Sequence, residues 1–495
     1  MTTPAPTFLA VPEATRVLEK ALAAPSIAVT VADAAAKSGL ALRDAERGLT
    51  ALVSEYRGHL RVSDEGDLVY VFPAGFTKPW EAGDAVRSGL RKVKRAAAGV
   101  ARFVVRAWLT IAIFAYVATF LAVLLGLTLA KQGDRDGLPG ASLFGALFRV
   151  LADALFWTFH PFSPLAIEPY GAGYARARRP RDETPFYEKV NRFVFGPPPP
   201  AEDPRESERR IVAEIRAKKG RVGLADVMRV TGLSRTQADG IMARLMLDYD
   251  GDVSVSEAGG IVYRFPALRK TADDGPSPRA PEPVWGRREA VPPLTGNGGG
   301  ANFLIAALNA FNLGMAGFAL SANLTLARIY NIWEMVRHPD LEIAPLGYDG
   351  VPIVLGLVPL VMSLAVFVLP VVRALGRPLA ERAVAKENGR RALLREVLEA
   401  TRKGEGVSAS RLRAAWSRAS GGPVDDAELT RVVVELGGDV DLEAAEKVRV
   451  ADPSADPVRY RFAELELEAE AVDEERAFAK ESERKIGKVV FTSED

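Results

Sequence analysis

Hydrophobic and polar positions repeat along this chain with either the helical period of 3.6 residues or the strand period of two. Each change of period predicts a new element. In ESERRIVAEIRAKKG, the apolar residues share one helical face, and the helix ends at Gly220. LADVMRVTG predicts a second short helix. SRTQADGIMARLMLDY predicts a third, opened by Ser234 and Gln237 at capping-box spacing. VSVSEAGGIVYRFP then alternates with period two around a glycine turn, which predicts a β-hairpin that ends at Pro266.

The same pattern occurs 193 residues earlier, where DEGDLVYVFP corresponds to EAGGIVYRFP. Thr30–Pro73 aligns with Gly223–Pro266 without a gap, and 15 of the 44 aligned positions are identical. The order of helix, helix–turn–helix and hairpin resembles the winged-helix fold, and another small α+β domain with a terminal hairpin is the alternative. The repeat predicts a structural core signature, which consists of Tyr70, Phe72, Tyr263 and Phe265.

A weaker third copy lies near the C-terminal end. RRALLREVLEATRKG stands for its first helix, VVVELGGDVDLE resembles RLMLDYDGDVSVS, and PVRYRF resembles GIVYRF. The spacing from Val440 to Tyr460 is ten residues longer than that from Val253 to Tyr263, which predicts a longer wing. The sequence therefore predicts three winged-helix-like domains.

Apolar segments between these copies predict membrane spans. Phe103–Ala130 and Val351–Val372 are long and apolar enough to cross about 30 Å of hydrocarbon. Ala301–Ala327 has the length but is punctuated by asparagine and glycine, which suit close helix packing in lipid; a polar transport path is the sharper alternative. Ser142–Ile167 carries charges and is interpreted as a fourth span, with an interfacial amphipathic helix as the alternative.

Basic residues cluster before Phe103–Ala130, after Ser142–Ile167 and after Val351–Val372. Under the positive-inside rule they predict that both termini and residues 168–300 lie in the cytoplasm, as in an integral protein of a bacterial inner membrane. The cluster before the first span also supplies candidate contacts to anionic lipid. Its members are Arg87, Arg91, Lys92, Lys94, Arg95 and Arg102.

The predicted fold class is therefore mixed: four α-helical membrane spans, as two hairpins, interleaved with three small α+β winged-helix-like domains. The N-terminal half is predicted to contain domain 1 (1–75), a basic juxtamembrane helix with the first membrane hairpin (76–180), and domain 2 (181–266). A Pro/Gly-rich linker (267–300), the second membrane hairpin (301–375) and domain 3 (376–465) follow. The last segment (466–495) is predicted to be a charged helix, expected to be solvated, and a tail.

Composition narrows the chemistry. The chain of 495 residues has no cysteine, so disulfides, thiolate catalysis and cysteine-ligated metals are excluded. Its three histidines do not lie at ligand spacing, and no P-loop, dinucleotide fingerprint or nucleophile–base arrangement occurs. We therefore predict no catalytic residue, cofactor or metal. The first residues lack the pattern of a cleavable signal peptide.

Three short stretches carry a family resemblance: FYEKVNRFVFGPPPP, DVSVSEAGGIVYRFP and IGKVVFTSED. The chain resembles poorly characterised integral membrane proteins of cyanobacteria and plastids over about half of its length. The resemblance implies a polytopic membrane protein with repeated domains. It brings no catalytic or binding residue with it.

Two functions fit this organisation. A membrane-anchored DNA-binding regulator would use the helices LRDAERGLTALVSEY and SRTQADGIMARLMLDY for major-groove contacts. However, Pro12–Pro73 has seven basic and nine acidic residues, a net of −2, and Arg205–Pro266 has eleven and nine, a net of +2. The wings SDEGD and SEAGG carry no basic residue, although a phosphate-facing wing needs one. The favoured hypothesis is a scaffold that binds protein partners or itself and contacts membrane lipid; transporter and enzyme are less favoured.

The absence of cysteine allows a direct test of the predicted topology. Single cysteines at Gly137, Ser277, Tyr348 and Ser493 are labelled in intact cells with a membrane-impermeant maleimide. We expect labelling at 137 and 348, and protection of 277 and 493 until lysis. Labelling at 277 in intact cells would contradict the four-span arrangement.

Overall fold

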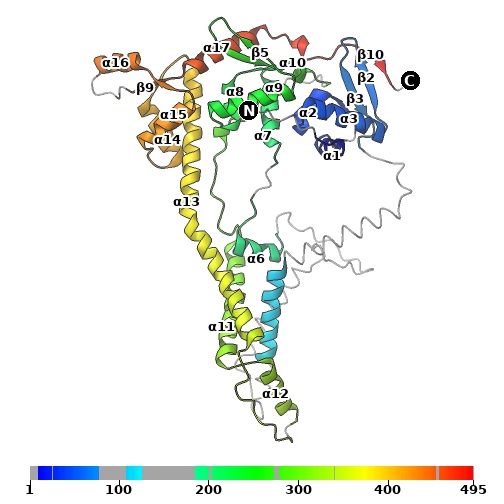
Figure 1. Cartoon of the computed structure of the whole chain (residues 1–495), viewed down its shortest axis with the longest axis vertical. Coiled ribbons are helices and arrows are strands. Elements are labelled where there is room, and N and C mark those ends of the chain that lie inside the picture. Colours follow the sequence, from blue (N-terminus) through cyan, green and yellow to red (C-terminus); the bar gives the residue numbers. More distant parts are fainter. Residues whose placement is uncertain are drawn as a thin grey trace, which may run out of the picture. The chain divides into compact units, whose positions relative to one another are not determined.

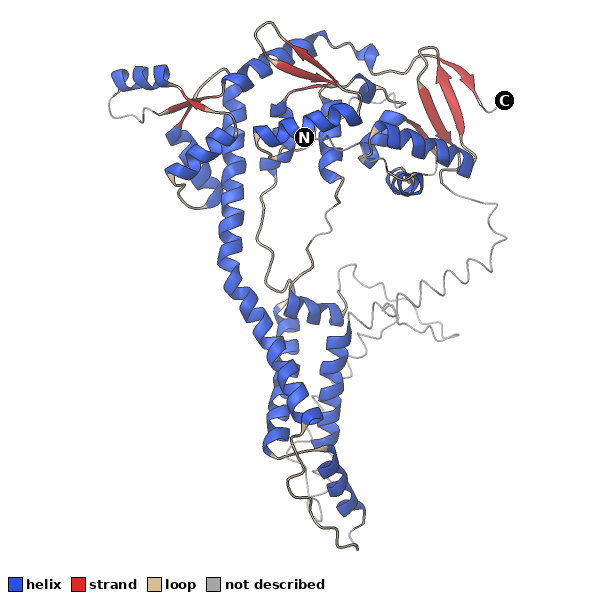
Figure 2. Cartoon of the chain, in the orientation of Figure 1, coloured by secondary structure: helices blue, strands red, loops and turns tan. Residues whose placement is uncertain are grey.

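The computed structural model describes residues 9–24, 26–76, 107–124, 184–199, 203–272, 278–338, 340–452, 456 and 458–493 (Figure 1). The chain divides into two compact units. Unit 1 comprises Met1–Gly83, Ala201–Ala290 and Glu381–Asp495, and unit 2 comprises Asp84–Pro200 and Val291–Ala380. The described strands all belong to unit 1, whereas the described elements of unit 2 are helical (Figure 2).

Unit 1 contains three domains in which the same order of elements recurs. Domain 1 (residues 9–76) consists of α1 (Val11–Ala21), β1 (Ile27–Thr30), α2 (Val31–Ser38), α3 (Leu42–Tyr56), β2 (His59–Ser63) and β3 (Leu68–Phe72). Domain 2 (residues 203–272) consists of α7 (Glu206–Ala217), β4 (Arg221–Val222), α8 (Leu224–Thr231), α9 (Arg235–Asp248), β5 (Asp252–Val255), β6 (Ile261–Arg264) and α10 (Pro266–Arg269).

Domain 3 (residues 381–462) begins with the C-terminal part of α13 (Val358–Thr401). It continues through β7 (Val407–Ser408), α14 (Ala409–Ser420), α15 (Asp426–Glu435), β8 (Asp439–Val440), the inserted helix α16 (Leu442–Ala451) and β9 (Arg459–Arg461). The insertion accounts for the longer spacing from Val440 to Tyr460. After domain 3 come α17 (Ala463–Phe478), the short helix η4 (Glu481–Glu483) and β10 (Val489–Thr492). A further short helix, η2 (Val284–Gly286), follows domain 2.

The three antiparallel sheets share one topology and one register. The strand orders are β1-β3-β2, β4-β6-β5 and β7-β9-β8, and β10 extends the first sheet beyond β2. A tyrosine on the central strand lies opposite two apolar partners in every case: Tyr70 faces Val29 and Leu60, Tyr263 faces Val222 and Val253, and Tyr460 faces Val407 and Val440. One cluster of buried apolar residues runs through all three domains.

Local caps explain where the helices of unit 1 begin. Ser234 and Gln237 form the predicted capping box at the start of α9. Thr30 and Asp33 form another at the start of α2. The Ser408 side chain accepts a hydrogen bond from the Arg411 backbone N–H at the start of α14. Each cap satisfies backbone N–H groups that the first helical turn leaves without partners.

A glycine lies against the last-strand phenylalanine in all three domains. A Cβ added to Gly58, Gly251 or Gly438 would lie 2.8, 2.6 or 2.5 Å from the ring of Phe72, Phe265 or Phe462, respectively. All three rings are essentially buried. The backbone before each hairpin therefore packs directly on the ring, and no larger residue fits without a shift.

Unit 2 holds three helices that are long and apolar enough to cross a membrane, among the residues that the structure describes. They are Ala107–Leu124, α11 (Gly299–Ser321) and the helix that runs from η3 (Ile353–Leu357) through α13. The fourth predicted span, Ser142–Ile167, lies outside the described residues, as does the basic cluster Arg87–Arg102. The connection after α11 contains α12 (Leu326–Arg337), which begins at the side-chain cap of Thr325.

Amide side chains join the helices of unit 2. Asn309 on α11 donates to the Ser363 carbonyl at 2.9 Å, and Asn312 donates to the Ile113 carbonyl at 3.0 Å. Both asparagines are fully buried. These bonds run from one apolar helix to the backbone of the next, which agrees with the interpretation that the amides serve helix packing.

The motif FYEKVNRFVFG forms α6 (Phe186–Phe195), a short amphipathic helix of unit 2. Val190 and Val194 are buried on one face. Arg373 donates to the carbonyls of Phe193 and Val194 at 3.2 and 2.9 Å, so its guanidinium caps the C-terminal end of α6. Gly196 follows with a φ of 91°, and a Cβ there would lie 2.6 Å from Arg373 Nη2. The glycine is therefore required by both backbone conformation and space.

Two expectations for the C-terminal segment are wrong. The helix α17 was predicted to be solvated, but Leu465, Ala471 and Val472 are buried, the last two against Val262 of domain 2. Residues after it were predicted to be a tail, whereas β10 forms an antiparallel pair with β2 of domain 1. Alternating glutamates masked the apolar stripe of α17, and strand pairing between distant segments leaves no local signal.

The glycine–phenylalanine contact leads to a stability prediction. Gly251→Ala overpacks the Phe265 ring and is expected to cost about 1–3 kcal/mol. Gly240→Ala is the matched control, because Gly240 is exposed inside α9 with no atom near its added Cβ; it should be neutral or stabilise by up to ~1 kcal/mol. Thermal unfolding of the purified chain measures both, and equal shifts would contradict the packing argument.

Candidate functional site

The candidate site residues predicted from sequence fall into two groups. Tyr70, Phe72, Tyr263 and Phe265 lie on the central strands or directly after them and are at most 4% exposed. Tyr263 also donates its hydroxyl to Asp239 at 3.2 Å, so this tyrosine is tied to α9. The six basic membrane-surface candidates lie outside the described residues. No group of metal-ligating side chains occurs among the residues described.

Three arginines on the candidate DNA-reading helices lie beside carboxylates. On α9, Arg235 forms an ion pair with Glu464, and Arg244 forms ion pairs with Glu208 and Asp248. On α3, Arg47 lies 3.8 Å from Asp44. Nucleic-acid binding depends on an excess of basic residues along the contact surface. The neighbouring carboxylates balance these cations, so the pairs leave the two helices without a marked excess of positive charge.

The C-terminal segment contacts the hairpins of domains 1 and 2, whose tips, residues 64–66 and 257–259, are exposed. The backbone of Ser493 donates to the Leu60 carbonyl at 2.9 Å, and Val489 lies opposite Ser63, so β10 occupies the free edge of β2. In domain 2, Glu475 on α17 accepts hydrogen bonds from Ser254 on β5 and from Arg264 on β6. The outer edge of β2 and one side of the β5–β6 hairpin are thus intramolecular interfaces.

A carboxylate at the start of the second helix joins each of the first two domains to a later segment. Asp33 lies 2.6 Å from Arg216 of α7 and accepts hydrogen bonds from the Thr271 hydroxyl at 2.8 Å and the Ala272 N–H at 2.9 Å. Burial by itself raises the pKa of Asp33, but Arg216 and these hydrogen bonds outweigh it and hold the pKa below its ordinary value.

The equivalent residue of domain 2 is Asp226. Its carboxylate accepts from the Gly223 N–H at 3.1 Å and lies 2.5 Å from Arg476 of α17. Gly223, at the N-terminus of α8, has no side chain with which to cap the helix, and α17 supplies the missing acceptor: Glu468 accepts from the Ala225 N–H at 2.8 Å. Burial raises the pKa of Glu468 to about 7, and Asp226 adds to the effect.

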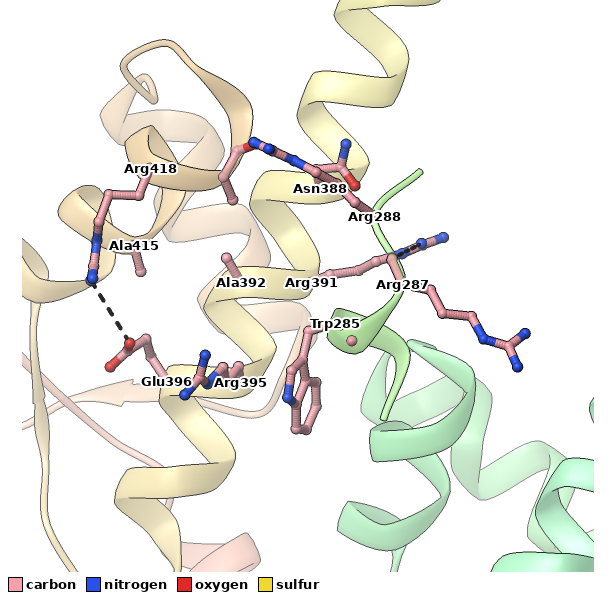
Figure 3. Close-up of a pocket in the computed structure, with 12 residues that line it drawn as sticks. Trp285, Arg287, Arg288, Asn388, Arg391, Ala392, Arg395, Glu396, Ala415 and Arg418 are labelled. Carbon is pink, nitrogen blue, oxygen red and sulfur yellow. Dashed lines mark hydrogen bonds and ion pairs between the residues drawn. The ribbon is translucent and has the colours of Figure 1, made fainter. Parts of the chain in front are cut away.

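A cleft lined by arginines lies between η2, α13 and α14 (Figure 3). Its volume is about 330 Å³. Trp285 lies on one side of α13 and Arg418 on the other, while the small side chains Ala392 and Ala415 leave space between them (Figure 3). The charged residues of the lining are Arg287, Arg288, Arg391, Arg395, Arg418 and Glu396.

Contacts between the linker and domain 3 hold the cleft together. The Glu289 backbone exchanges two hydrogen bonds of 2.9 Å with the Asn388 side chain. Arg391 binds Glu289 at 2.7 Å and Glu387 at 2.9 Å, and Arg288 donates to the Ala419 carbonyl at 2.9 Å. Residues 284–289, which the sequence placed in a linker, are therefore anchored on both α13 and α14.

Sequence reasoning missed this cleft. Its arginines come from three segments, residues 285–288, 388–396 and 415–419, and each segment on its own has the composition of an ordinary solvated surface. The two arginines of α13, Arg391 and Arg395, are four residues apart and share a helical face, which is the one local signal available.

Comparisons with known proteins give one distant similarity. The chain is 27% identical over 256 residues to a protein of Arabidopsis thaliana described as an uncharacterized chloroplastic protein. The match covers 49% of this chain and 47% of the relative, so it spans about half the length of each. No protein-family model and no solved structure matches the chain. The similarity accords with the resemblance to plastid proteins and brings no functional residue.

The environment of Glu468 leads to a pH prediction. Its pKa is about 7 when α17 is docked and near 4.5 when it is released, so its contribution to stability is present below pH 4.5 and is lost as the pH rises through 7. We expect the thermal midpoint to fall between pH 5 and 8, with a free-energy loss on the order of 2–3 kcal/mol. Glu468→Gln keeps the hydrogen-bond acceptor for the Ala225 N–H and should remove most of the fall of the thermal midpoint with pH.

Glu474→Gln is the matched control for that measurement, because Glu474 is exposed on the same helix. It should leave the dependence of the thermal midpoint on pH unchanged. Burial also raises the pKa of Glu214, so a smaller slope of the same sign is expected to persist in Glu468→Gln. A wild-type midpoint that rises from pH 5 to 8 would contradict the assignment.

Proposed function

We propose that this chain is an integral membrane scaffold whose three winged-helix domains, held together by the C-terminal segment, bind protein partners in the aqueous compartment beside the membrane. The apolar helices of unit 2 form the anchor, with Ser142–Ile167 as a fourth span. The proposed setting is the bacterial inner membrane, with the domains cytoplasmic. The chloroplastic description of the Arabidopsis relative supports a plastid membrane as a second setting.

Three regularities support the winged-helix assignment. The domains share an order of helix, strand, two helices and two strands. Their sheets share strand order and tyrosine register. The glycine–phenylalanine contact recurs in each. Independent folds would not be expected to agree in all three respects, so duplication of one module is the simplest explanation.

The observation that carries the scaffold proposal is that the hairpins of domains 1 and 2 are bound by residues of the same chain, while the loops at their tips expose acidic side chains. A DNA-binding winged helix needs a cationic wing and a cationic helix, whereas here β10 pairs with β2, α17 packs on β6 and the α9 arginines have carboxylate partners. Other open surfaces carry apolar residues. Leu247 on α9 is 78% exposed and Leu442 on α16 is 77% exposed, which favours protein contacts over phosphate contacts.

Helix α16 is the element best suited to a partner. None of its residues is buried, and both Leu442 and Val450 project into solvent. A helix that buries nothing in its own domain gains little stability from the fold. Its apolar residues are explained if they are buried against another protein.

Two measurements on the full chain test the proposal. A photo-crosslinking amino acid at Leu442 or Leu247 should give discrete protein adducts in living cells, because these side chains would lie in the partner interface. The same amino acid at Lys447, an exposed polar position of α16, should give fewer. Binding of the detergent-purified protein to a labelled mixed-sequence DNA duplex is measured in parallel, with no saturable binding expected.

The DNA alternative makes the opposite prediction. Saturable binding that weakens steeply as salt is raised, together with the absence of adducts at Leu442 and Leu247, would overturn the scaffold proposal.

A further inference from the structure

We propose that the arginine cleft between η2, α13 and α14 is a binding site for a phosphate-bearing anion. The ligand chemistry is a phosphate monoester or diphosphate, either free in solution or as the headgroup of an anionic lipid. This site is separate from the proposed scaffold function, and the two proposals are tested by different experiments.

The charge lining the cleft is strongly positive. Five arginines and one glutamate contribute, a formal balance of +4 from the lining alone. Carboxylates outside the lining pair with some of these cations: Glu387 and Glu289 with Arg391, Glu399 with Arg395, and Glu206 with Arg287 at 3.7 Å. Burial lowers the pKa of Arg210 on α7, and Arg287 adds to that effect.

Two of the guanidinium groups keep donors for a ligand. Arg395 donates from Nε to Glu399 at 2.7 Å, and neither of its terminal nitrogens bonds to a described residue. Arg418 donates from Nε to the Ala414 carbonyl at 3.2 Å, and its Nη2 lies 4.0 Å from Glu396, beyond hydrogen-bond distance. Their side chains are 55% and 74% exposed, so both are accessible and can adjust.

Phosphate suits this arrangement better than carboxylate does. The planar fork of arginine matches two phosphate oxygens at once, and a phosphate presents three oxygens and up to two negative charges to several guanidinium groups. Exposed arginine–carboxylate pairs contribute ~0–1 kcal/mol each, so a dianion can displace Glu396 from Arg418 at little cost. Trp285 adds an apolar wall on one side, and about 330 Å³ accommodates more than a single phosphate group.

The experiment uses the full chain purified in a neutral detergent and two probes. Inorganic pyrophosphate binding is measured by titration calorimetry, and retention of phosphatidate over phosphatidylcholine is measured in nanodiscs. The test variant is Arg395→Gln/Arg418→Gln, which should weaken binding about tenfold or more through loss of bidentate hydrogen bonds. Arg395→Lys/Arg418→Lys keeps the charge without the fork and should show an intermediate loss.

The matched control is Arg431→Gln/Arg449→Gln, which removes the same charge from exposed positions outside the cleft that pair within their own helices. Its binding should equal that of the wild type. Glu396→Gln removes the single acidic group of the lining and should tighten binding several-fold. Thermal midpoints of all variants confirm that they fold.

Either probe can support the site. Pyrophosphate binding that depends on Arg395 and Arg418 identifies a soluble ligand, and phosphatidate retention without pyrophosphate binding identifies a lipid headgroup. Absence of saturable binding to both probes, or equal losses in the test and control variants, would overturn the proposal. The crosslinking that tests the scaffold function does not involve these arginines, so the two failures are distinguishable.

Discussion

Two buried carboxylates hold unit 1 together. Asp33 and Asp226 each close the first turn of a helix in their own domain, and each also pairs with an arginine from a later part of the chain, Arg216 or Arg476. A carboxylate buried in this way is stable only when its charge is compensated, and loss of one partner typically costs about 3–5 kcal/mol. The start of the second helix in one domain therefore depends on the presence of a later segment. In domain 3 the corresponding residue is Arg411, which pairs with Glu396 of its own domain at 2.6 Å. At this position domain 3 therefore pairs within itself and not with a later segment.

The C-terminal segment extends this dependence across the whole of unit 1. Glu468 supplies a backbone acceptor that Gly223 cannot provide, Glu475 binds the wing of domain 2, and β10 completes the sheet of domain 1. These contacts join residues more than 200 positions apart, so closing them costs more chain entropy than forming the contacts inside each domain. They also remove the unpaired edge of β2, which would otherwise be open to association with other strands. The three domains alone would leave these surfaces exposed, and the segment that follows domain 3 packs against them.

The sequence predicted best what short-range physics determines. The capping box of Ser234 and Gln237, the hairpin before Pro266 and the long connection between Val440 and Tyr460 all follow from local pattern, and the structure contains each of them. The burial of α17 was missed because six glutamates and one aspartate among its 16 residues conceal the apolar positions Leu465, Ala471 and Val472. The pairing of Val489 with Ser63 and the convergence of Trp285, Arg395 and Arg418 depend on tertiary packing, and no local pattern in the sequence indicates them.

The arginine cleft joins two segments whose mutual contacts are individually weak. Residues 284–289 are held on domain 3 by hydrogen bonds between the Glu289 backbone and Asn388, by the exposed ion pair of Arg391 with Glu289, and by the hydrogen bond from Arg288 to the Ala419 carbonyl. Each such exposed pair contributes ~0–1 kcal/mol, so the contact is marginal without further support. An anion bound to Arg287 or Arg288 from the linker and to Arg395 or Arg418 from domain 3 would add its own binding free energy to that contact. By linkage, whatever strengthens the contact between the linker and domain 3 also raises the affinity for the anion. The proposed ligand would thus stabilise the linker against domain 3, at the segment that leads directly into the apolar helix α11.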